Sequence, residues 1–560
     1  MGVGAPAARQ AADGVVTDPL DEEKQKLFPP LRNRILAQAA GALGENRAHL
    51  AEPLVSKFLK KHPNDPSALN LMADIARRAE RFAEAEQLLS RCVEQSACAG
   101  YRFNYAVVLR RLDKFDEALA QLDELLIKEP RNPLYREQKA EVLNLMRRQD
   151  EAFVIHRELS EEFPNSPDVW LNYGDTWRST GHFDQCIAAY HKALELAPTL
   201  SAGYPRLVEL KFYRFTMADI EWMEKQLDVP GLSADDRANL YFALGNAYGD
   251  QEFYAKSFEF YAKANALRRL GVGFDPERLS AYRLNCQSVF TEAFFRDRIG
   301  WGCASSAPIF IVGIPRSGST LLEQILCGHT AIEGLGELAD LGNTIASGVP
   351  SGGKEGQASV DYVKRLRSLA ADDFRSICGR YLDLTARRRR LGRPYFTDKA
   401  LTNFWHAGLI HLILPNAKII DVRRHPLDCG WSCFKTRFPT GQPFADKLSD
   451  IGQHYADYVR LMAHFDHVLP GRIHRVIYED LVANPETEIR RLFDYLGLPF
   501  EEQCLRFHEN PRTVRTLSVE QVRMPLYRSG MGQWRPYEPW LGPLRAALGP
   551  VLDAYPDVPK

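Results

Sequence analysis

One stretch of sequence decides the fold class of the second half of the chain: Pro308-Ile-Phe-Ile-Val-Gly-Ile-Pro-Arg-Ser-Gly-Ser-Thr320. Its first part, residues 308–313, is an apolar, β-branched run that is typical of a buried parallel strand. A Gly-rich turn follows, and the apolar residues of 321–326 then recur with helical spacing. A strand, a Gly-rich turn and a helix together bind a phosphate or sulfate through backbone N–H groups and the helix N-terminus. We therefore expect an α/β domain with a largely parallel sheet and an anion site at this turn.

The turn differs from that of nucleoside triphosphatases at one position. Gly313, Gly318 and Thr320 fit the pattern GxxxxGK[ST], but Ser319 stands where the pattern has Lys. That Lys binds the β- and γ-phosphates, so its absence favours a nucleotide that lacks them. Arg316, inside the turn, instead offers a planar set of N–H donors to a phosphate or sulfate oxygen.

A second segment repeats the pattern of an apolar run followed by basic residues. Residues 416–422, Asn-Ala-Lys-Ile-Ile-Asp-Val, predict another strand, and Arg423-Arg-His-Pro-Leu-Asp-Cys-Gly-Trp-Ser432 follows it. Asp421 at the end of this strand could mimic a Mg²⁺-binding carboxylate, although the polar end of a core strand is the favoured interpretation. The basic run Arg387–Arg390 is interpreted as a solvated helix face with no function.

The two segments together resemble the sulfotransferases that use 3′-phosphoadenosine 5′-phosphosulfate (PAPS). PRSGST is similar to their 5′-phosphosulfate loop, and Arg424 and Ser432 stand at the anchoring positions of their 3′-phosphate segment. His425 and Leu427 depart from the Asp and Arg that are usual there. The resemblance covers approximately residues 300–545 and is closest to the tyrosylprotein sulfotransferase branch and its bacterial, repeat-fused relatives. The supporting pieces are Gly336-Glu337, Asp398-Lys399, Tyr478-Glu-Asp-Leu481, Leu517-Ser518 and Trp534.

The resemblance implies catalytic roles for four residues. Glu337 would be the base that takes the proton of the acceptor hydroxyl, and a drier site would raise its pKa for that purpose. Lys399 would meet the bridging oxygen as charge develops there, with Arg316 on the sulfuryl oxygens and Ser518 near the sulfuryl group. His329 and His425 are competing candidates for the base, because other sulfotransferases use a His for this step.

The resemblance also implies a donor site that needs no metal. One set of residues would bind the 5′-phosphosulfate, with Arg316 on its sulfuryl oxygens and four residues on its phosphate: Ser317, Gly318, Ser319 and Thr320. A second set would bind the 3′-phosphate or the adenine: Arg424, Ser432, Tyr478 and Arg528.

The first half of the chain contains a repeat with a period close to 34 residues. Ala85, Ala118, Ala152 and Cys186 fall at one position of the repeat, with spacings of 33, 34 and 34. The best copy carries Trp170, Tyr173, Gly174 and Trp177, and a later copy returns with Gly245 and Tyr261 after a degenerate stretch. The pattern resembles tetratricopeptide repeats, whose helical hairpins stack into a superhelix with a concave groove.

These observations predict a multidomain architecture. Residues 1–33 are expected to form a flexible tail, residues 34–299 an all-α tetratricopeptide array, and residues 300–560 the α/β sulfotransferase domain. The groove of the array is expected to hold a peptide, a partner protein or a second copy of the chain, or to pack on the other domain.

The composition excludes several classes of partner. Lys and Arg total 71 against 72 Asp and Glu, so we expect neither nucleic acid nor an anionic membrane as the main partner. The sequence lacks an apolar run of the ~18 residues that a membrane span needs. Ten cysteines without paired CxxC motifs predict reduced thiols and a cytoplasmic location, and Cys429 and Cys433 predict packing rather than a metal site.

The predicted function is transfer of a sulfuryl group from PAPS to an acceptor hydroxyl, with protein or peptide tyrosine as the favoured acceptor. A carbohydrate or small-molecule hydroxyl is the alternative within catalysis. Two further functions stay open, namely a tetratricopeptide scaffold with a vestigial nucleotide site and an ATP-dependent kinase. The oligomeric state stays open as well, with a homo-oligomer among the possibilities.

Overall fold

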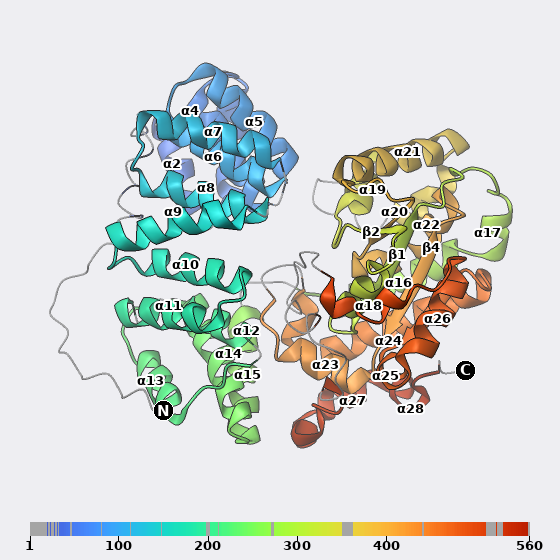
Figure 1. Ribbon diagram of the computed structural model, residues 1–560. Coiled ribbons are helices and arrows are strands. Elements are labelled where there is room, and N and C mark those ends of the chain that lie inside the picture. The colour runs from blue at the N-terminus through green and yellow to red at the C-terminus, as the bar shows by residue number, and fades with distance from the viewer. Residues whose placement is uncertain are drawn as a thin grey trace. The chain divides into compact units, whose positions relative to one another are not determined.

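The computed structural model describes most of the chain, and it divides the chain into two compact units, Met1–Leu207 and Val208–Lys560 (Figure 1). The described residues are 20, 23, 27, 31, 33–44, 47–79, 81–112, 114–146, 148–197, 202–210, 212–269, 274–349, 362–438, 442–510, 522 and 530–557. Most of the expected tail, residues 1–33, therefore lies outside them.

The first unit is a stack of antiparallel helical hairpins, as Figure 1 shows in blue and green. The helices are α2 (Arg34–Gly44), α3 (Ala48–Leu59), α4 (Pro66–Arg78), α5 (Phe82–Gln95), α6 (Ala99–Arg111), α7 (Phe115–Lys128), α8 (Pro133–Leu145), α9 (Gln149–Glu162), α10 (Pro167–Ser179) and α11 (Phe183–Leu196). The residues that defined the repeat, Ala85, Ala118, Ala152 and Cys186, are all fully buried. The predicted repeat is confirmed, because the same position is used for close packing in each hairpin.

The hairpins begin and close by recurring local devices. Asp65, Asn132 and Ser166 accept hydrogen bonds from backbone N–H groups at the start of α4, α8 and α10, and each is followed by Pro at the first helical position. Gly174 lets α10 approach α11, because a Cβ atom there would lie 2.5 Å from the ring of Tyr190.

The second unit begins with further helices, two of which carry the predicted late copy of the repeat. They are α13 (Met217–Leu227), α14 (Ala234–Asp250), α15 (Tyr254–Arg269), α16 (Pro276–Val289) and α17 (Glu292–Arg296), while α12 (Gly203–Glu209) crosses the boundary between the units. The predicted late copy is present, since Gly245 on α14 packs against Tyr261 on α15. The compact unit thus starts at residue 208, whereas the sequence placed the start of the second domain at residue 300.

The sheet of the second unit has five strands in the order β2-β3-β1-β4-β5, and all neighbouring pairs are parallel. The strands are β1 (Pro308–Gly313), β2 (Ile332–Gly334), β3 (Tyr395–Asp398), β4 (Lys418–Arg423) and β5 (Ile473–Ile477). The predicted parallel sheet is confirmed. Its first strand has the predicted bounds, and β4 begins two residues after the predicted start.

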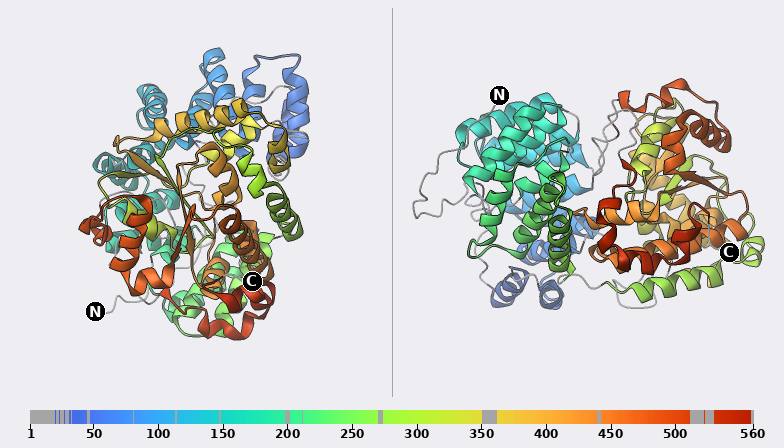
Figure 2. Two further views of the ribbon diagram at one scale, coloured as in Figure 1. Left: turned by 90° about the vertical axis from the view of Figure 1, so that its right-hand side faces the viewer. Right: turned by 90° about the horizontal axis from the view of Figure 1, so that it is seen from below.

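Helices cover both faces of this sheet (Figure 2). Ile309 and Ile311 of β1 face a core formed with α18 (Ser319–Leu326) and α26 (Pro485–Leu496). Phe310 and Val312 face the opposite core, formed with α21 (Ala371–Arg388), α22 (Ala407–Ile413) and α24 (Leu448–Val468). A strand buried on both faces explains why residues 308–313 are continuously apolar. The remaining helices are α19 (Asp340–Gly348), α20 (Tyr362–Arg365), α23 (Pro426–Phe434), α25 (Tyr478–Ala483), α27 (Gly542–Leu548) and α28 (Pro550–Ala554).

Helices α14, α15 and α16, termed the late repeat helices, contribute side chains to the core that contains Phe310 and Val312. Phe258 on α15 stacks on Trp431 of α23, with ring centroids 6.2 Å apart. Asn265 on α15 donates a hydrogen bond to the Phe434 carbonyl at 2.8 Å, and Arg283 on α16 pairs with the buried Asp457 of α24 at 2.8 Å. Helices α15 and α16 therefore pack against the elements that follow β4.

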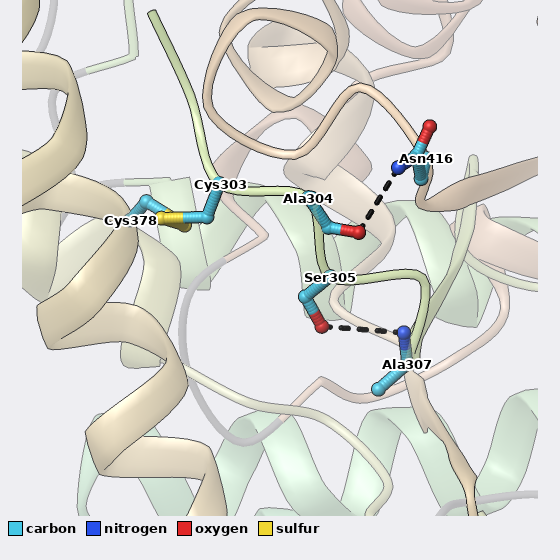
Figure 3. Close-up of a disulfide and its surroundings, with 6 residues drawn as sticks. All are labelled: Cys303, Ala304, Ser305, Ala307, Cys378 and Asn416. Atoms are coloured by element: carbon cyan, nitrogen blue, oxygen red, sulfur yellow. Dashed lines mark hydrogen bonds between the residues drawn. A yellow bond between two sulfur atoms is a disulfide. The ribbon is translucent and has the colours of Figure 1, made fainter.

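A disulfide joins Cys303, ahead of β1, to Cys378 on α21, with the Cα atoms 6.3 Å apart (Figure 3). The prediction that the cysteines are reduced thiols is wrong for this pair. The two residues are 75 positions apart, so no local spacing could indicate the bond. The other cysteines in the described part of the chain are free thiols. None of the helices described combines the length and the apolar character that a membrane span requires.

Candidate active site

The Gly-rich turn between β1 and α18 has an unusual backbone. Gly318 precedes the helix with φ +99°, and a Cβ atom there would lie 2.5 Å from the Tyr478 ring, so only glycine fits. Arg316 also has positive φ, at +71°. Such a conformation costs a non-glycine residue about 1–3 kcal/mol and is concentrated at functional sites. The turn thus stores strain at the residue expected to bind the sulfuryl group.

The two basic segments of the sequence meet at this turn. The Arg316 Nε donates a hydrogen bond to the Ser432 Oγ at 3.0 Å, and the Arg424 Nη1 donates to the Arg316 carbonyl at 3.0 Å. Arg424 lies 108 positions from Arg316 in the chain. The adjacency follows from the topology, because β1 and β4 are neighbours in a parallel sheet and both segments leave at the same edge.

Aromatic and thiol side chains pack against the Gly-rich turn between β1 and α18. The Tyr478 ring, where α25 follows β5, lies against Gly318 and 5.1 Å from the Arg424 guanidinium carbon. Burial raises the pKa of the Tyr478 hydroxyl. The thiols of Cys429 and Cys433 on α23 each donate to the Pro315 carbonyl at 3.2 Å. Both cysteines are thus packing residues of the turn.

The turn has the chemistry that an anionic group requires. Ser317 is buried, and its Oγ has no hydrogen-bond partner among the described residues. A buried hydroxyl without a partner is costly, and a ligand oxygen would satisfy it. The Arg424 Nε is likewise buried without a partner in the described part of the chain. Ser319 and Thr320 are buried in the first turn of α18, so the residues present fit a phosphate or phosphosulfate group.

Lys399 and Glu337 form an ion pair. The Lys399 Nζ donates to the Glu337 Oε1 at 2.7 Å, and the exposed fractions of the two side chains are 1% and 62%. A buried ammonium needs such a partner, because an unpaired charge is expensive to bury. The dry environment expected for Glu337 is absent from this structure, since its carboxylate projects to the surface.

A network behind Lys399 involves residues to which the sequence assigned no role. The buried Asp398 accepts hydrogen bonds from the Tyr381 hydroxyl at 2.9 Å and the Ala400 N–H at 3.1 Å. Burial raises the pKa of Asp398 to about 7, and the two donors oppose that rise. Tyr381 lies on α21, within a helix that carries no motif, so no sequence signal indicated it.

The two histidines proposed as competing bases are held elsewhere. His329 is buried, with its Nε2 3.0 Å from the Pro499 carbonyl and its Nδ1 accepting from the Ala331 N–H. His425 packs between Trp534 and Tyr555, and burial lowers the pKa of its imidazole. In the described part of the chain neither imidazole is hydrogen-bonded to Lys399 or Glu337.

Other charged residues of the sequence have structural partners. Asp421 accepts hydrogen bonds from Arg423 and Arg475 at 3.1 Å each, and from the Tyr458 hydroxyl. It is therefore a buried, hydrogen-bonded residue inside β4 rather than an open carboxylate, and the strand continues to Arg423. Arg388 pairs with the buried Asp340, so the prediction of a wholly solvated basic run is wrong at that position. Ser518 and Arg528 lie outside the described residues.

Known sequence families match both parts of the chain. Residues 308–502 match a family described as "Sulfotransferase family", and residues 167–200 match "Tetratricopeptide repeat". Residues 45–125 match "Anaphase-promoting complex, cyclosome, subunit 3".

Individual relatives match over different extents. A protein of Aquifex aeolicus (strain VF5), named "Uncharacterized protein", is 29% identical over 554 residues, which cover 93% of this chain and 71% of the relative. A Caenorhabditis briggsae protein named "Putative protein-tyrosine sulfotransferase" is 26% identical over 203 residues, covering 36% of this chain and 69% of the relative. The structure of the sulfotransferase domain from the curacin biosynthetic pathway matches 42% of this chain and 99% of its own, at 21% identity and a TM-score of 0.29.

Proposed function

We propose that this chain, which joins tetratricopeptide repeats to a C-terminal sulfotransferase domain, transfers a sulfuryl group from PAPS to a hydroxyl of a protein or peptide, tyrosine first. The observation that carries the proposal is the contact between the two donor segments. Arg316 reaches Ser432, and Arg424 reaches the backbone of Arg316. A site for a nucleotide with phosphates at both its 5′ and 3′ positions needs these segments side by side.

The proposed donor site divides between the two segments. Ser317, Gly318, Ser319 and Thr320 would bind the 5′-phosphate through N–H groups, the unpartnered Ser317 hydroxyl and the N-terminus of α18. Arg424 and Ser432 would bind the 3′-phosphate, with Tyr478 fixing the plane of the Arg424 guanidinium. The Arg316 side chain would turn toward the sulfuryl oxygens, which Ser432 allows because a hydroxyl is a replaceable partner.

The proposed chemistry uses the ion pair of Lys399 and Glu337. PAPS, when bound, supplies a sulfuryl group on a good leaving group. Glu337 takes the proton of the acceptor hydroxyl as the hydroxyl oxygen bonds to sulfur. Lys399, already buried and charged, neutralises the oxygen that leaves sulfur. The products are a sulfate ester and 3′,5′-adenosine bisphosphate, and the proton ends on Glu337.

The proposed acceptor rests on the name of the Caenorhabditis relative and on the exposed position of Glu337, which a large acceptor can reach. The repeats of the first unit are proposed to hold the acceptor protein, since helical repeats present extended concave surfaces. The proposed location stays cytoplasmic, which the free thiols of the described cysteines favour and the Cys303–Cys378 disulfide opposes.

The test begins with ligand binding. Calorimetric titration of the full chain with 3′,5′-adenosine bisphosphate should show a micromolar or tighter Kd, while ATP with Mg²⁺ should bind at least about tenfold more weakly. Preference for ATP would reject the proposal. Arg424→Ala should weaken bisphosphate binding about 10–100-fold, because a charged hydrogen bond contributes about 1.5–3 kcal/mol.

The test continues with turnover. Tyrosine peptides, carbohydrates and small phenols are offered with labelled PAPS, and label on the peptide alone supports the proposed acceptor. Glu337→Gln should lower kcat about 10²–10⁴-fold with bisphosphate affinity retained. Lys399→Ala should lower kcat about 10²–10³-fold. Lys364→Ala, at an exposed position of α20, is the matched control and should leave both quantities unchanged.

A further inference from the structure

A buried carboxylate that no motif explains lies on the helix that follows the anion-binding turn. Glu323 on α18 is 1% exposed, between the fully buried apolar residues Leu322 and Ile325 of the same helix. Its Oε1 accepts two hydrogen bonds, from the Gly336 N–H at 3.0 Å and from the Thr397 hydroxyl at 2.8 Å. A carboxylate in such a place is costly unless it is hydrogen-bonded.

The two donors belong to the segments that carry the proposed reacting residues. Gly336 directly precedes Glu337 and has φ +79°, so the chain turns sharply at that point. Thr397 lies on β3, two residues before Lys399. The Gly336 carbonyl in turn accepts a hydrogen bond from the Lys399 N–H at 2.9 Å. Glu323 therefore completes a closed set of hydrogen bonds between the turn at Gly336, the end of β3 and α18.

The geometry points to Glu323 as a positioning residue that fixes Glu337 and Lys399 relative to the anion-binding turn between β1 and α18. This inference rests on the proposed function for the roles of Glu337 and Lys399. The Glu323 Oε1 accepts hydrogen bonds from Gly336 and Thr397, and neither of these residues belongs to the anion-binding turn. Glu323 holds the segments that bear the base and the cation on the helix that binds the donor.

The matched control is a second buried carboxylate of the same sheet region. The Glu333 Oε1 on β2 accepts hydrogen bonds from the Arg390 N–H at 2.6 Å and the Leu391 N–H at 3.0 Å. These bonds tie β2 to the segment after α21 rather than to the turn at Gly336 or to Thr397. Glu323→Leu and Glu333→Leu both remove a buried carboxylate that accepts two hydrogen bonds. Only the first change cuts the connection to Glu337 and Lys399.

The experiment compares these variants of the full chain by turnover, bisphosphate affinity and amide hydrogen exchange. Glu323→Leu should lower kcat about 10–100-fold and leave the Kd for 3′,5′-adenosine bisphosphate within about threefold. The peptide that contains the Gly336 amide should exchange at least about tenfold faster. Glu323→Gln keeps the acceptor oxygen and should lose less than about fivefold in kcat. Glu333→Leu should change neither kcat nor exchange at Gly336.

Two outcomes would overturn the inference. One is an equal loss of kcat in Glu323→Leu and Glu333→Leu at equal loss of stability, and the other is unchanged exchange at Gly336. If Glu323→Leu does not fold, Thr397→Val removes the hydrogen bond from the Thr397 hydroxyl to Glu323 without changing the side-chain shape. That variant should lower kcat about 3–10-fold, and unchanged turnover would refute the inference. A wild-type chain that transfers nothing from PAPS contradicts the proposed function alone, because hydrogen exchange at Gly336 still measures the connection.

Discussion

Two hairpins of the same repeat, α10–α11 and α14–α15, close by the same device and then meet different surroundings. In the first, Gly174 lies against Tyr190, and in the second, Gly245 lies against Tyr261. A Cβ atom at either glycine would come within 2.8 Å of the tyrosine ring. The internal packing of a hairpin is therefore encoded by its own residues, whichever compact unit the hairpin belongs to.

The outward faces of the two hairpins differ. Phe183 at the start of α11 is 36% exposed, whereas Phe258 on α15 is stacked among Trp431, Phe434 and Trp540. The 34-residue period does not predict whether an outward-facing ring is covered, because the outward positions do not contribute to the repeat. The comparison teaches that a repeat predicts how a hairpin closes and not which domain it stabilises.

Truncation of the chain has the largest expected effect, and it tests whether the late repeat helices stabilise the second unit. A fragment of residues 203–560 keeps α12 to α17 and should unfold cooperatively and bind 3′,5′-adenosine bisphosphate within about threefold of the full chain. A fragment of residues 300–560 loses Phe258 and Arg283 and exposes the apolar surface they cover. It should aggregate or lack a cooperative transition in differential scanning calorimetry. Equal stability of the two fragments would show that the late repeat helices are independent of the sheet.

Two ion pairs, one buried in the second unit and one exposed in the first, should differ in their contribution to the free energy of unfolding. Arg283 on α16 pairs with Asp457, whose side chain is almost wholly buried, whereas Arg148 and Glu151 pair at the surface of the first unit. Arg283→Ala should cost about 1–3 kcal/mol, because it removes the nearest cation of a buried carboxylate, which then keeps Arg460 at 3.9 Å and the Ser280 hydroxyl. Arg148→Ala should change the free energy of unfolding by no more than the error of a urea titration. Similar losses in the two variants would contradict the proposed difference in burial.

A pair of phenylalanine truncations gives the smallest expected effect. Phe258→Ala removes a half-buried ring from an aromatic cluster and should destabilise the second unit by about 2 kcal/mol. Phe183→Ala removes a ring that is 36% exposed and should change stability by less than about 1 kcal/mol. Thermal unfolding of both variants is the measurement. A larger loss of stability in Phe183→Ala than in Phe258→Ala would show that the outward face of α11 is covered more than that of α15.

The sequence predicted the elements whose signals are local. The bounds of β1, the helix after the turn and the repeat frame of Ala85 to Cys186 follow from periodicity, which depends on burial of one face or both. The predicted donor site requires the segments of Arg316 and Ser432 to lie close together, as two strand-end segments of a parallel sheet do, but the hydrogen bond between the two side chains was not predicted.

The features that the sequence did not predict depend on contacts between distant segments. Tyr381 and Glu323 lie in helices and have no unusual spacing, so only the folded chain shows that they face Asp398 and Gly336. Asp340 with Arg388 and Cys303 with Cys378 are further examples. The expected dry surroundings of Glu337 were wrong, since a carboxylate can satisfy a buried lysine while most of its own surface stays in water.

The disulfide between Cys303 and Cys378 makes the stability of the second unit depend on the redox state of the solution around the protein. A covalent link that closes a loop of this length typically contributes about 2–4 kcal/mol, largely by restricting the unfolded chain. Glutathione at the level of a bacterial or animal cytosol keeps most protein thiols reduced, whereas secretory spaces do not. The same polypeptide would therefore exist as two chemically distinct species in those environments, with unequal lifetimes against heat and proteases.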